Sequence, residues 1–185
     1  MFGGGCASHQ AVDVLPDSAI QKSGKPFYIT SFSEHFVGRT MVGAHINRLG
    51  KNIAGKFAGR YYNQLCLCLQ ITAADALKEL RANQLPWALA TAFDASLIQG
   101  EDFPKEDLGE SLVIKQSNAT GEAVASAKGI YERLDSAIEY LSRYFTLKIG
   151  DIVLVDAGLE PVKMTIDDKI ICTVNDNESI HIKVK

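Results

Sequence analysis

The sequence predicts a single α+β domain that is mainly β. Its length of 185 residues suits one domain with a sizeable hydrophobic core. Short apolar or alternating runs, typical of strands, outnumber the segments with helical spacing. Turn-forming clusters of glycine, asparagine and aspartate separate these runs. Hydrophobic residues make up 46% of the chain and charged residues 22%, as in ordinary globular domains.

The first half of the chain begins with a segment, residues 1–24, that is glycine-rich and that we expect to be irregular within the single domain 1–185. Apolar and alternating patterns predict strands at residues 25–30, 36–46 and 62–71. Residues 54–61 favour one or two helical turns. A helix is predicted over 73–82, where Thr72 precedes a run of helix formers and Asp75 follows three residues later.

The second half has an acidic stretch, residues 100–109, that we interpret as a loop. Apolar residues at helical spacing predict a helix over 135–144. Strands are expected at 112–115, 152–155, 162–166, 169–174 and 179–184. In the last of these, Ile180, Ile182 and Val184 alternate with polar residues, which is typical of a half-exposed edge strand.

Charge and cysteine content exclude several classes of protein. The formal net charge of −3, without a basic block, gives no indication of nucleic-acid binding. No apolar run approaches the roughly 20 residues of a membrane span, and no signal peptide is evident, so we expect no membrane partner. The four cysteines form no CxxC pair, which indicates free thiols and predicts a cytoplasmic protein.

Five stretches, in chain order, resemble the fumarylacetoacetate hydrolase family. They begin with Pro16-Asp17-Ser18 and end with Pro161-Val162-Lys163, and the stretches cover residues 16–29, 46–53, 85–96, 140–151 and 161–163. The second of these is similar to some bacterial members. The resemblance implies a mixed β-sandwich roll with few short helices, usually assembled as a homodimer.

The family's chemistry implies a metal site that this sequence lacks. Its enzymes hydrolyse, decarboxylate or isomerise acidic 2-oxo or β-dicarbonyl compounds. They use Mg²⁺, Mn²⁺ or Ca²⁺ held by a Glu-x-Glu pair and an aspartate. These three positions fall on Arg39, Met41 and Gln70. Because hard cations prefer carboxylate oxygens, we expect no metal cofactor here.

Other pocket positions of the family also differ. Family residues that line the pocket are replaced by Ala74, Leu77 and Thr91, and the loop at 156–160 is shortened. His9 remains as a candidate acid–base residue. Asp75 and Asp94 are further candidates, either as a residual acidic pair or, as we prefer, as local structure in which one aspartate pairs with Arg39.

Three further patterns have a plainer interpretation. His9, His35, His45 and His181 can in principle bind zinc, but none has the spacing of a known zinc motif. Cys66 and Cys68 alternate within an apolar run, which favours core packing over a nucleophile. Arg39 beside Gln70 can bind an organic anion without metal.

The sequence therefore predicts a catalytically inactive member of the family. Such a pseudoenzyme binds a small organic acid or a partner subunit, either a second copy or a related chain. The alternative is a divergent hydrolase, decarboxylase or isomerase of acidic 2-oxo compounds that uses His9, Asp75 or Asp94.

Overall fold

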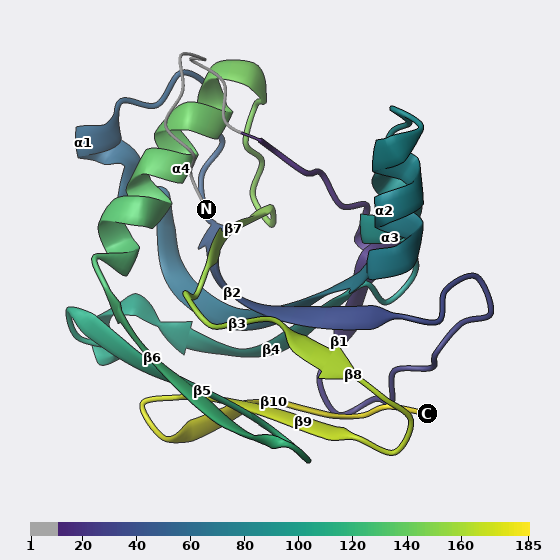
Figure 1. The fold of residues 1–185 in the computed structure, drawn as a ribbon. Coiled ribbons are helices and arrows are strands. Elements are labelled where there is room, and N and C mark those ends of the chain that lie inside the picture. Colours follow the sequence, from purple (N-terminus) through teal and green to yellow (C-terminus); the bar gives the residue numbers. More distant parts are fainter. Residues whose placement is uncertain (1–10) are drawn as a thin grey trace.

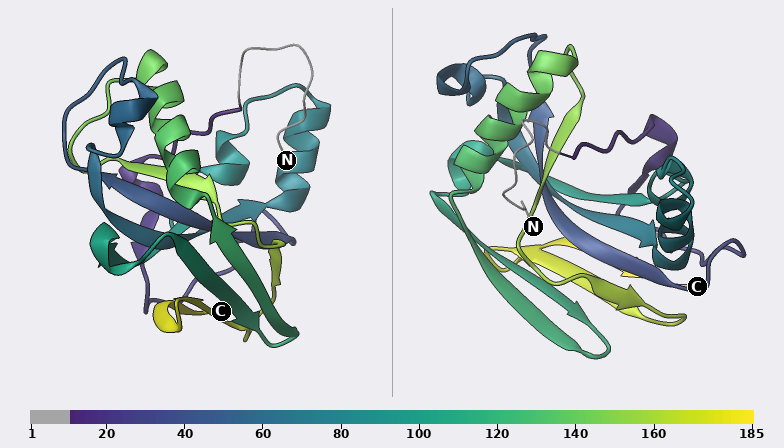
Figure 2. Two further views of the ribbon diagram at one scale, coloured as in Figure 1. Left: turned by 90° about the vertical axis from the view of Figure 1, so that its left-hand side faces the viewer. Right: turned by 45° about the horizontal axis from the view of Figure 1, so that its top comes forward.

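The computed structural model describes residues 11–185, which form two stacked β-sheets with helices on the outer face of the larger one (Figure 1). This arrangement confirms the predicted α+β, mainly β, class. The two sheets bury a shared core, and Figure 2 shows them crossing at an angle. None of the helices among residues 11–185 is long and apolar enough to cross a membrane.

The larger sheet has the order β1-β4-β3-β2-β7, with β8 pairing beside β7 along the same edge of β2. Only the β1–β4 pair is parallel, and the other pairs are antiparallel. Its strands are β1 (Ile20–Lys22), β2 (Phe36–Ile46), β3 (Tyr62–Ala73), β4 (Leu97–Pro104), β7 (Ile152–Asp156) and β8 (Val162–Met164).

The smaller sheet is antiparallel, with the order β10-β9-β5-β6. Its strands are β5 (Ser111–Asn118), β6 (Gly121–Lys128), β9 (Lys169–Val174) and β10 (Asn177–Lys183). β10 is an edge strand whose apolar residues are buried, as the alternation predicts. The turn before it contains Asn175 and Asp176, both at positive φ, which asparagine and aspartate tolerate better than most residues.

The helices lie on the outer face of the larger sheet in two groups (Figure 1). α1 (Gly55–Ala58) and α4 (Ile130–Tyr144) lie at one end, and α2 (Ala74–Ala82) and α3 (Ala88–Thr91) lie at the other. Two 3-10 turns, η1 (Asp17–Ala19) and η2 (Lys105–Asp107), flank β1 and β4. The segment before η1 runs over the same outer face (Figures 1 and 2).

The alternation along β2 determines which side chains face the core. Phe36, Thr40 and Val42 are buried against the smaller sheet, whereas Arg39 and Met41 point to the outer face and are more exposed. The Thr40 hydroxyl donates a hydrogen bond to Oε1 of Gln116 on β5 at 2.5 Å. This buried bond joins the two sheets.

Two predictions about individual elements were wrong, and one strand was missed. Residues 25–30 form no strand and make only an isolated bridge, between Phe27 and Val184, whereas the strand lies earlier, at β1. The stretch 100–109 is not a loop, since most of it belongs to β4 and η2. Its acidic residues are exposed on these elements, whereas Gly100 and the residues of β4 before it are buried. β6 was missed because its alanine-rich sequence gives no apolar alternation.

The helix predicted at 135–144 begins earlier, at Ile130, directly after Gly129. Gly129 has a φ of 66°, a conformation that glycine adopts without steric cost. The buried residues of this helix, which include Ile130, Leu134 and Ile138, pack it onto the larger sheet. α4 therefore lies next to β7 and delivers side chains toward the end of that strand.

Candidate functional site

Arg39, Met41 and Gln70 lie together on the outer face of the larger sheet. Arg39 is directly opposite Gln70 in the β2–β3 ladder, and Met41 lies two residues further along β2. On its other side, Met41 is opposite Asp156, the last residue of β7. Because residues opposite each other in an antiparallel pair point to the same face, these side chains share one surface.

The central feature of this surface is an ion pair between Arg39 and Asp156. Nη1 of Arg39 lies 2.6 Å from Oδ2 of Asp156, and the two side chains are 45% and 37% exposed. The other carboxylate oxygen accepts a hydrogen bond from the backbone N–H of Gly158 at 2.7 Å. Arg133 on α4 donates to the backbone carbonyl of Asp156 at 2.8 Å. A carboxylate and two guanidinium groups therefore meet where solvent reaches them.

The loop after β7 fixes the position of this carboxylate. Ala157 is buried, and its N–H donates to the carbonyl of Thr40 at 3.0 Å, which extends the pairing with β2 by one residue. Gly158 then turns the chain with a φ of 87°, where a side chain would be strained. This loop thus holds Asp156 beside Arg39.

The acidic residues that the sequence singled out lie elsewhere. Asp75 is in the first turn of α2, where it accepts hydrogen bonds from the Ser33 hydroxyl and from the N–H groups of Glu34 and Ala76. The bond from Ser33, followed by the backbone bonds, lowers the pKa of Asp75 to about 2. Asp94 is exposed in the turn between α3 and β4. The prediction that one of these aspartates pairs with Arg39 was wrong, because Asp156 does.

The remaining candidates are placed as follows. Ala74 and Leu77 belong to α2, and Thr91 is buried in α3 with its hydroxyl bonded to the carbonyl of Trp87 at 3.2 Å. They contribute no charged group to the surface around Arg39. His9 lies outside the described residues.

The residues at the family's metal position do not fit a hard divalent cation. Met41 and Gln70 offer a thioether and an amide, and the neighbouring carboxylate of Asp156 is already paired with Arg39. At about 4 Å, the guanidinium repels a divalent ion by several kcal/mol at an effective dielectric near 20. We therefore derive no catalytic step through such an ion.

A second polar cluster lies on the same face, further along β2 and β3. It consists of His45, Cys66 and Asp102, whose possible ligand atoms all lie within 4.8 Å of one another. Sequence reasoning missed this group, because its members come from three strands and share no motif.

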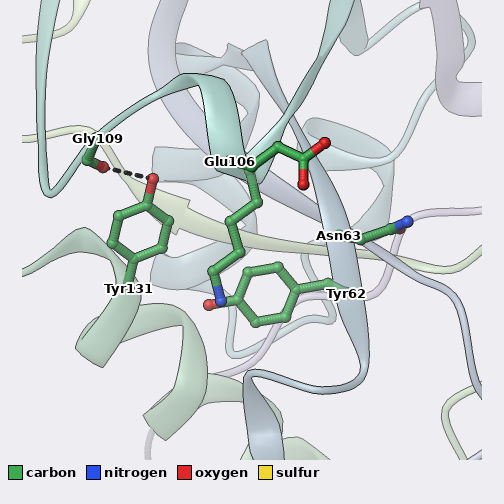
Figure 3. Close-up of a pocket in the computed structure, with 6 residues that line it drawn as sticks. Tyr62, Asn63, Glu106, Gly109 and Tyr131 are labelled. Atoms are coloured by element: carbon green, nitrogen blue, oxygen red, sulfur yellow. Dashed lines mark hydrogen bonds between the residues drawn. The ribbon is translucent and has the colours of Figure 1, made fainter.

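A third feature is an open pocket of about 430 Å³ between β3, η2 and α4 (Figure 3). The ammonium group of Lys105 lies 4.2 Å from the ring centre of Tyr62 and 5.2 Å from that of Tyr131. Tyr131 donates to the carbonyl of Gly109 at 2.8 Å, and Tyr62 donates to Asp135 at 3.0 Å. The lysine contacts both rings from one wall of the pocket, and we interpret these contacts as cation–π interactions that connect η2 to β3 and α4.

The sequence matches the family described as fumarylacetoacetate (FAA) hydrolase C-terminal over residues 7–174. The chain belongs to this family. The similarity extends to solved structures: the fumarylpyruvate hydrolase of Pseudomonas aeruginosa, crystallised with Mn²⁺ and pyruvate, superposes with a TM-score of 0.80. That alignment covers 92% of this chain and 77% of the other at 19% identity.

Relatives with assigned activities are also similar along the chain. The human protein named oxaloacetate tautomerase FAHD1, mitochondrial, is 26% identical over 183 residues, which cover 96% of this chain and 82% of the relative. The oxaloacetate decarboxylase, mitochondrial, of Dictyostelium discoideum is 27% identical over 134 residues. That match covers 66% of this chain and 58% of the relative.

These relatives contradict the expectation of a catalytically inactive protein, since they are named as enzymes. The expectation relied on the loss of one set of metal ligands. Loss of that set removes one Lewis acid, but it leaves a surface that carries an exposed guanidinium and an exposed carboxylate. The relatives named here also include eukaryotes, so the bacterial likeness of residues 46–53 is not distinctive.

Proposed function

We propose that this member of the family is an enzyme that moves a proton next to the carbonyl group of an acidic 2-oxo acid, with oxaloacetate as the representative substrate. The observation that carries the proposal is the Arg39–Asp156 pair, since the resemblance assigns the position of Arg39 to the family's metal site. The names of the human and Dictyostelium relatives support this class of substrate.

Arg39 is suited to hold the anionic substrate. A guanidinium has five N–H donors in a planar fork that matches a carboxylate. In Arg39, Nη1 donates one of these hydrogen bonds to Asp156. The side chain is 45% exposed, so its other face can receive a carboxylate or a 2-oxo oxygen from solvent. Its permanent positive charge stabilises the negative charge that develops on an enolate oxygen, which is one part of a metal ion's role.

Asp156 is suited to carry the proton. In the proposed step, its carboxylate takes a proton from C3 of the oxaloacetate keto form, and the C–H electrons form the C2–C3 double bond of the enolate. The carbonyl electrons move to O2, the enolate oxygen takes a proton from solvent and yields the enol, and Asp156 returns its proton to solvent; the reverse sequence returns the keto form. The hydrogen bond from Gly158 and the contact with Arg39 hold the carboxylate in place for this transfer.

The experiment that tests the proposal is a tautomerase assay with the enol form of oxaloacetate, followed by the loss of its ultraviolet absorbance. Wild type is expected to accelerate the conversion above the buffer rate, and Arg39→Gln is expected to reduce kcat/KM by about 100-fold, the scale of one transition-state donor. Lys163→Gln serves as a matched control, because this exposed cation lies on β8 at the same edge of the sheet. Equal rates for wild type and Arg39→Gln would refute the proposal.

Decarboxylation of oxaloacetate is a second candidate activity, because the loss of CO₂ leaves the enolate of pyruvate. The same guanidinium would stabilise that enolate, and the Dictyostelium relative is named for this reaction. Pyruvate formation, measured in the same reaction mixture, separates the two activities. An increase in pyruvate above the spontaneous rate would assign decarboxylation to the protein.

Assembly and compartment are further parts of the proposal. We expect a homodimer or a pair with a related subunit, which light scattering of the purified chain would test.

Cys66, Cys68 and Cys172 are free thiols, which supports a reducing compartment such as the cytoplasm. The human and Dictyostelium relatives are named as mitochondrial, so localisation by microscopy is the direct test.

A further inference from the structure

The His45–Cys66–Asp102 cluster joins three neighbouring strands of the larger sheet. His45 is on β2, Cys66 on β3 and Asp102 on β4, where Cys66 and Asp102 are paired directly. Nε2 of His45 lies 2.9 Å from Oδ1 of Asp102, and one ligand atom from each residue lies within 4.8 Å of the others. His45 lies four positions beyond Met41 on β2, about 13 Å along an extended strand, and Arg39 lies two positions further away. The cluster is therefore distinct from the Arg39–Asp156 pair.

A β-bulge brings the carboxylate to this face. Cys66 is opposite Asp102, and Cys68 is opposite Gln99. Two steps along β3 therefore correspond to three steps along β4. In a regular strand, residues three apart point to opposite faces. The extra residue of the bulge allows Gln99 and Asp102 to point to the same face, as the hydrogen bond between them at 3.3 Å requires.

We propose that His45, Cys66 and Asp102 form a binding site for a divalent ion of the zinc class. An imidazole, a thiolate and a carboxylate are the three kinds of ligand that Zn²⁺ takes, and bond lengths of about 2.0–2.3 Å place such donors roughly 3.3–3.8 Å apart. The donor atoms in this cluster need only small shifts to reach those separations. The sulfur and nitrogen donors favour zinc, cobalt or copper over the oxygen-seeking Mg²⁺.

The groups around these ligands suit a metal site. The amide nitrogen of Gln99 lies 3.2 Å from Nε2 of His45, and the sulfur of Cys68 lies 3.7 Å from that of Cys66. Both contacts place polar groups directly beside the proposed ligands. Gly43 leaves the necessary room, because a Cβ at this position would lie 2.9 Å from the sulfur of Cys66.

The three proposed ligands differ in how exposed their side chains are to solvent. Cys66 is 1% exposed, whereas the side chains of His45 and Asp102 are 20% and 36% exposed. An ion can enter from the side of Asp102 and keep a water molecule in its fourth position. A nucleophilic role for Cys66 fits less well, because a substrate carbon would have to reach a buried sulfur. The site accordingly gives the Cys66 thiol a role beyond core packing.

The test uses Co²⁺ as a spectroscopic probe added to the metal-stripped full-length chain. One equivalent is expected to give a thiolate-to-cobalt charge-transfer band in the near ultraviolet, and Zn²⁺ is expected to remove that band by displacement. An excess of Mg²⁺ is expected to leave it unchanged. Absence of the band at one equivalent of Co²⁺ would overturn the proposal.

Variants assign the ligands. Cys66→Ser is expected to abolish the band, and Asp102→Asn, at a half-exposed position that tolerates change, is expected to weaken Zn²⁺ binding by about 100-fold. Cys172→Ser is the matched control, since Cys172 is buried in the smaller sheet beside Thr40. An undiminished band in Cys66→Ser, or unchanged Zn²⁺ affinity in Asp102→Asn, would contradict the assignment. Because the readout is spectroscopic, it is independent of the tautomerase assay.

Discussion

Arg39 and Asp156 are 117 residues apart in the sequence, yet a guanidinium nitrogen of one lies 2.6 Å from a carboxylate oxygen of the other. The β2–β7 ladder brings them together on the outer face of the larger sheet. In the proposed function, the guanidinium supplies the positive charge and the aspartate moves the proton. An exposed ion pair of this kind contributes at most about 1 kcal/mol to stability, so folding depends little on it.

Restoring the family's carboxylates should create a site for a hard cation. The triple variant Arg39→Glu, Met41→Glu and Gln70→Asp is expected to gain saturable Mn²⁺ binding by calorimetry, because three carboxylates then converge on one face. Both this variant and its parent should carry Asp102→Asn, so that the second cluster does not contribute. The single variant Arg39→Gln removes the repulsion without adding a ligand, and it should bind Mn²⁺ no better than its parent. A folded triple variant without binding would show that these positions do not form one site.

Asp75 should make unfolding depend on pH under acidic conditions. Its pKa is lowered from 3.8 to about 2 in the folded chain, so its ionised form stabilises the fold fully above about pH 4. That contribution is lost as the pH falls from about 4 to 2. Since the side chain is partly exposed, we expect Asp75→Asn to cost about 1 kcal/mol at neutral pH.

The measurement is urea denaturation of wild type and Asp75→Asn at several pH values from 7 to 2. The free energy of unfolding of the variant should fall less steeply below about pH 4. Asp94→Asn, at an exposed turn position, should follow the wild-type curve. Identical slopes for Asp75→Asn and wild type would mean that the Ser33 and backbone hydrogen bonds do not stabilise the carboxylate.

The buried hydrogen bond between Thr40 and Gln116 should contribute to the free energy of unfolding, because it joins the two sheets. Thr40→Val leaves the Gln116 amide oxygen without this donor, which costs about 1–3 kcal/mol when the group is buried. Thr40→Val combined with Gln116→Leu should cost less than the sum of the single changes, because neither side of the Thr40–Gln116 bond is then left unpaired, although the Glu160 carbonyl loses its donor in both Gln116 variants. Denaturant unfolding measures this cycle, with Thr120→Val on the exposed β5–β6 turn as a control. Strict additivity would contradict the coupling.

Much of the fold was predictable because the patterns are local. β2, β3 and β9 have residues of alternating or continuous apolar character, and their predicted bounds agree closely with the structure. β6 escaped prediction because alanine, serine and glutamate carry little strand signal. Residues 25–30 have the composition of a strand, but tertiary pairing selected Ile20–Lys22 instead.

The candidate sites were less predictable because they depend on long-range pairing. The family resemblance identified Arg39, Met41 and Gln70 as positions of interest, but no sequence spacing connects Arg39 with Asp156. His45, Cys66 and Asp102 have no motif spacing either, and a bulge between strands brings the last of them to the common face. Motifs within one segment can be found by inspection, whereas sites assembled across a sheet require the register.

The most direct test of the proposed activity is the exchange of the C3 hydrogens of oxaloacetate with solvent in D₂O, followed by proton NMR. If Asp156 removes the C3 proton, wild type should accelerate exchange at least about tenfold over buffer, and Asp156→Asn should return it to the buffer rate. Asp75→Asn, which changes a carboxylate outside this surface, should retain the wild-type rate. Undiminished exchange by Asp156→Asn would contradict the assignment of proton transfer to the Arg39–Asp156 pair.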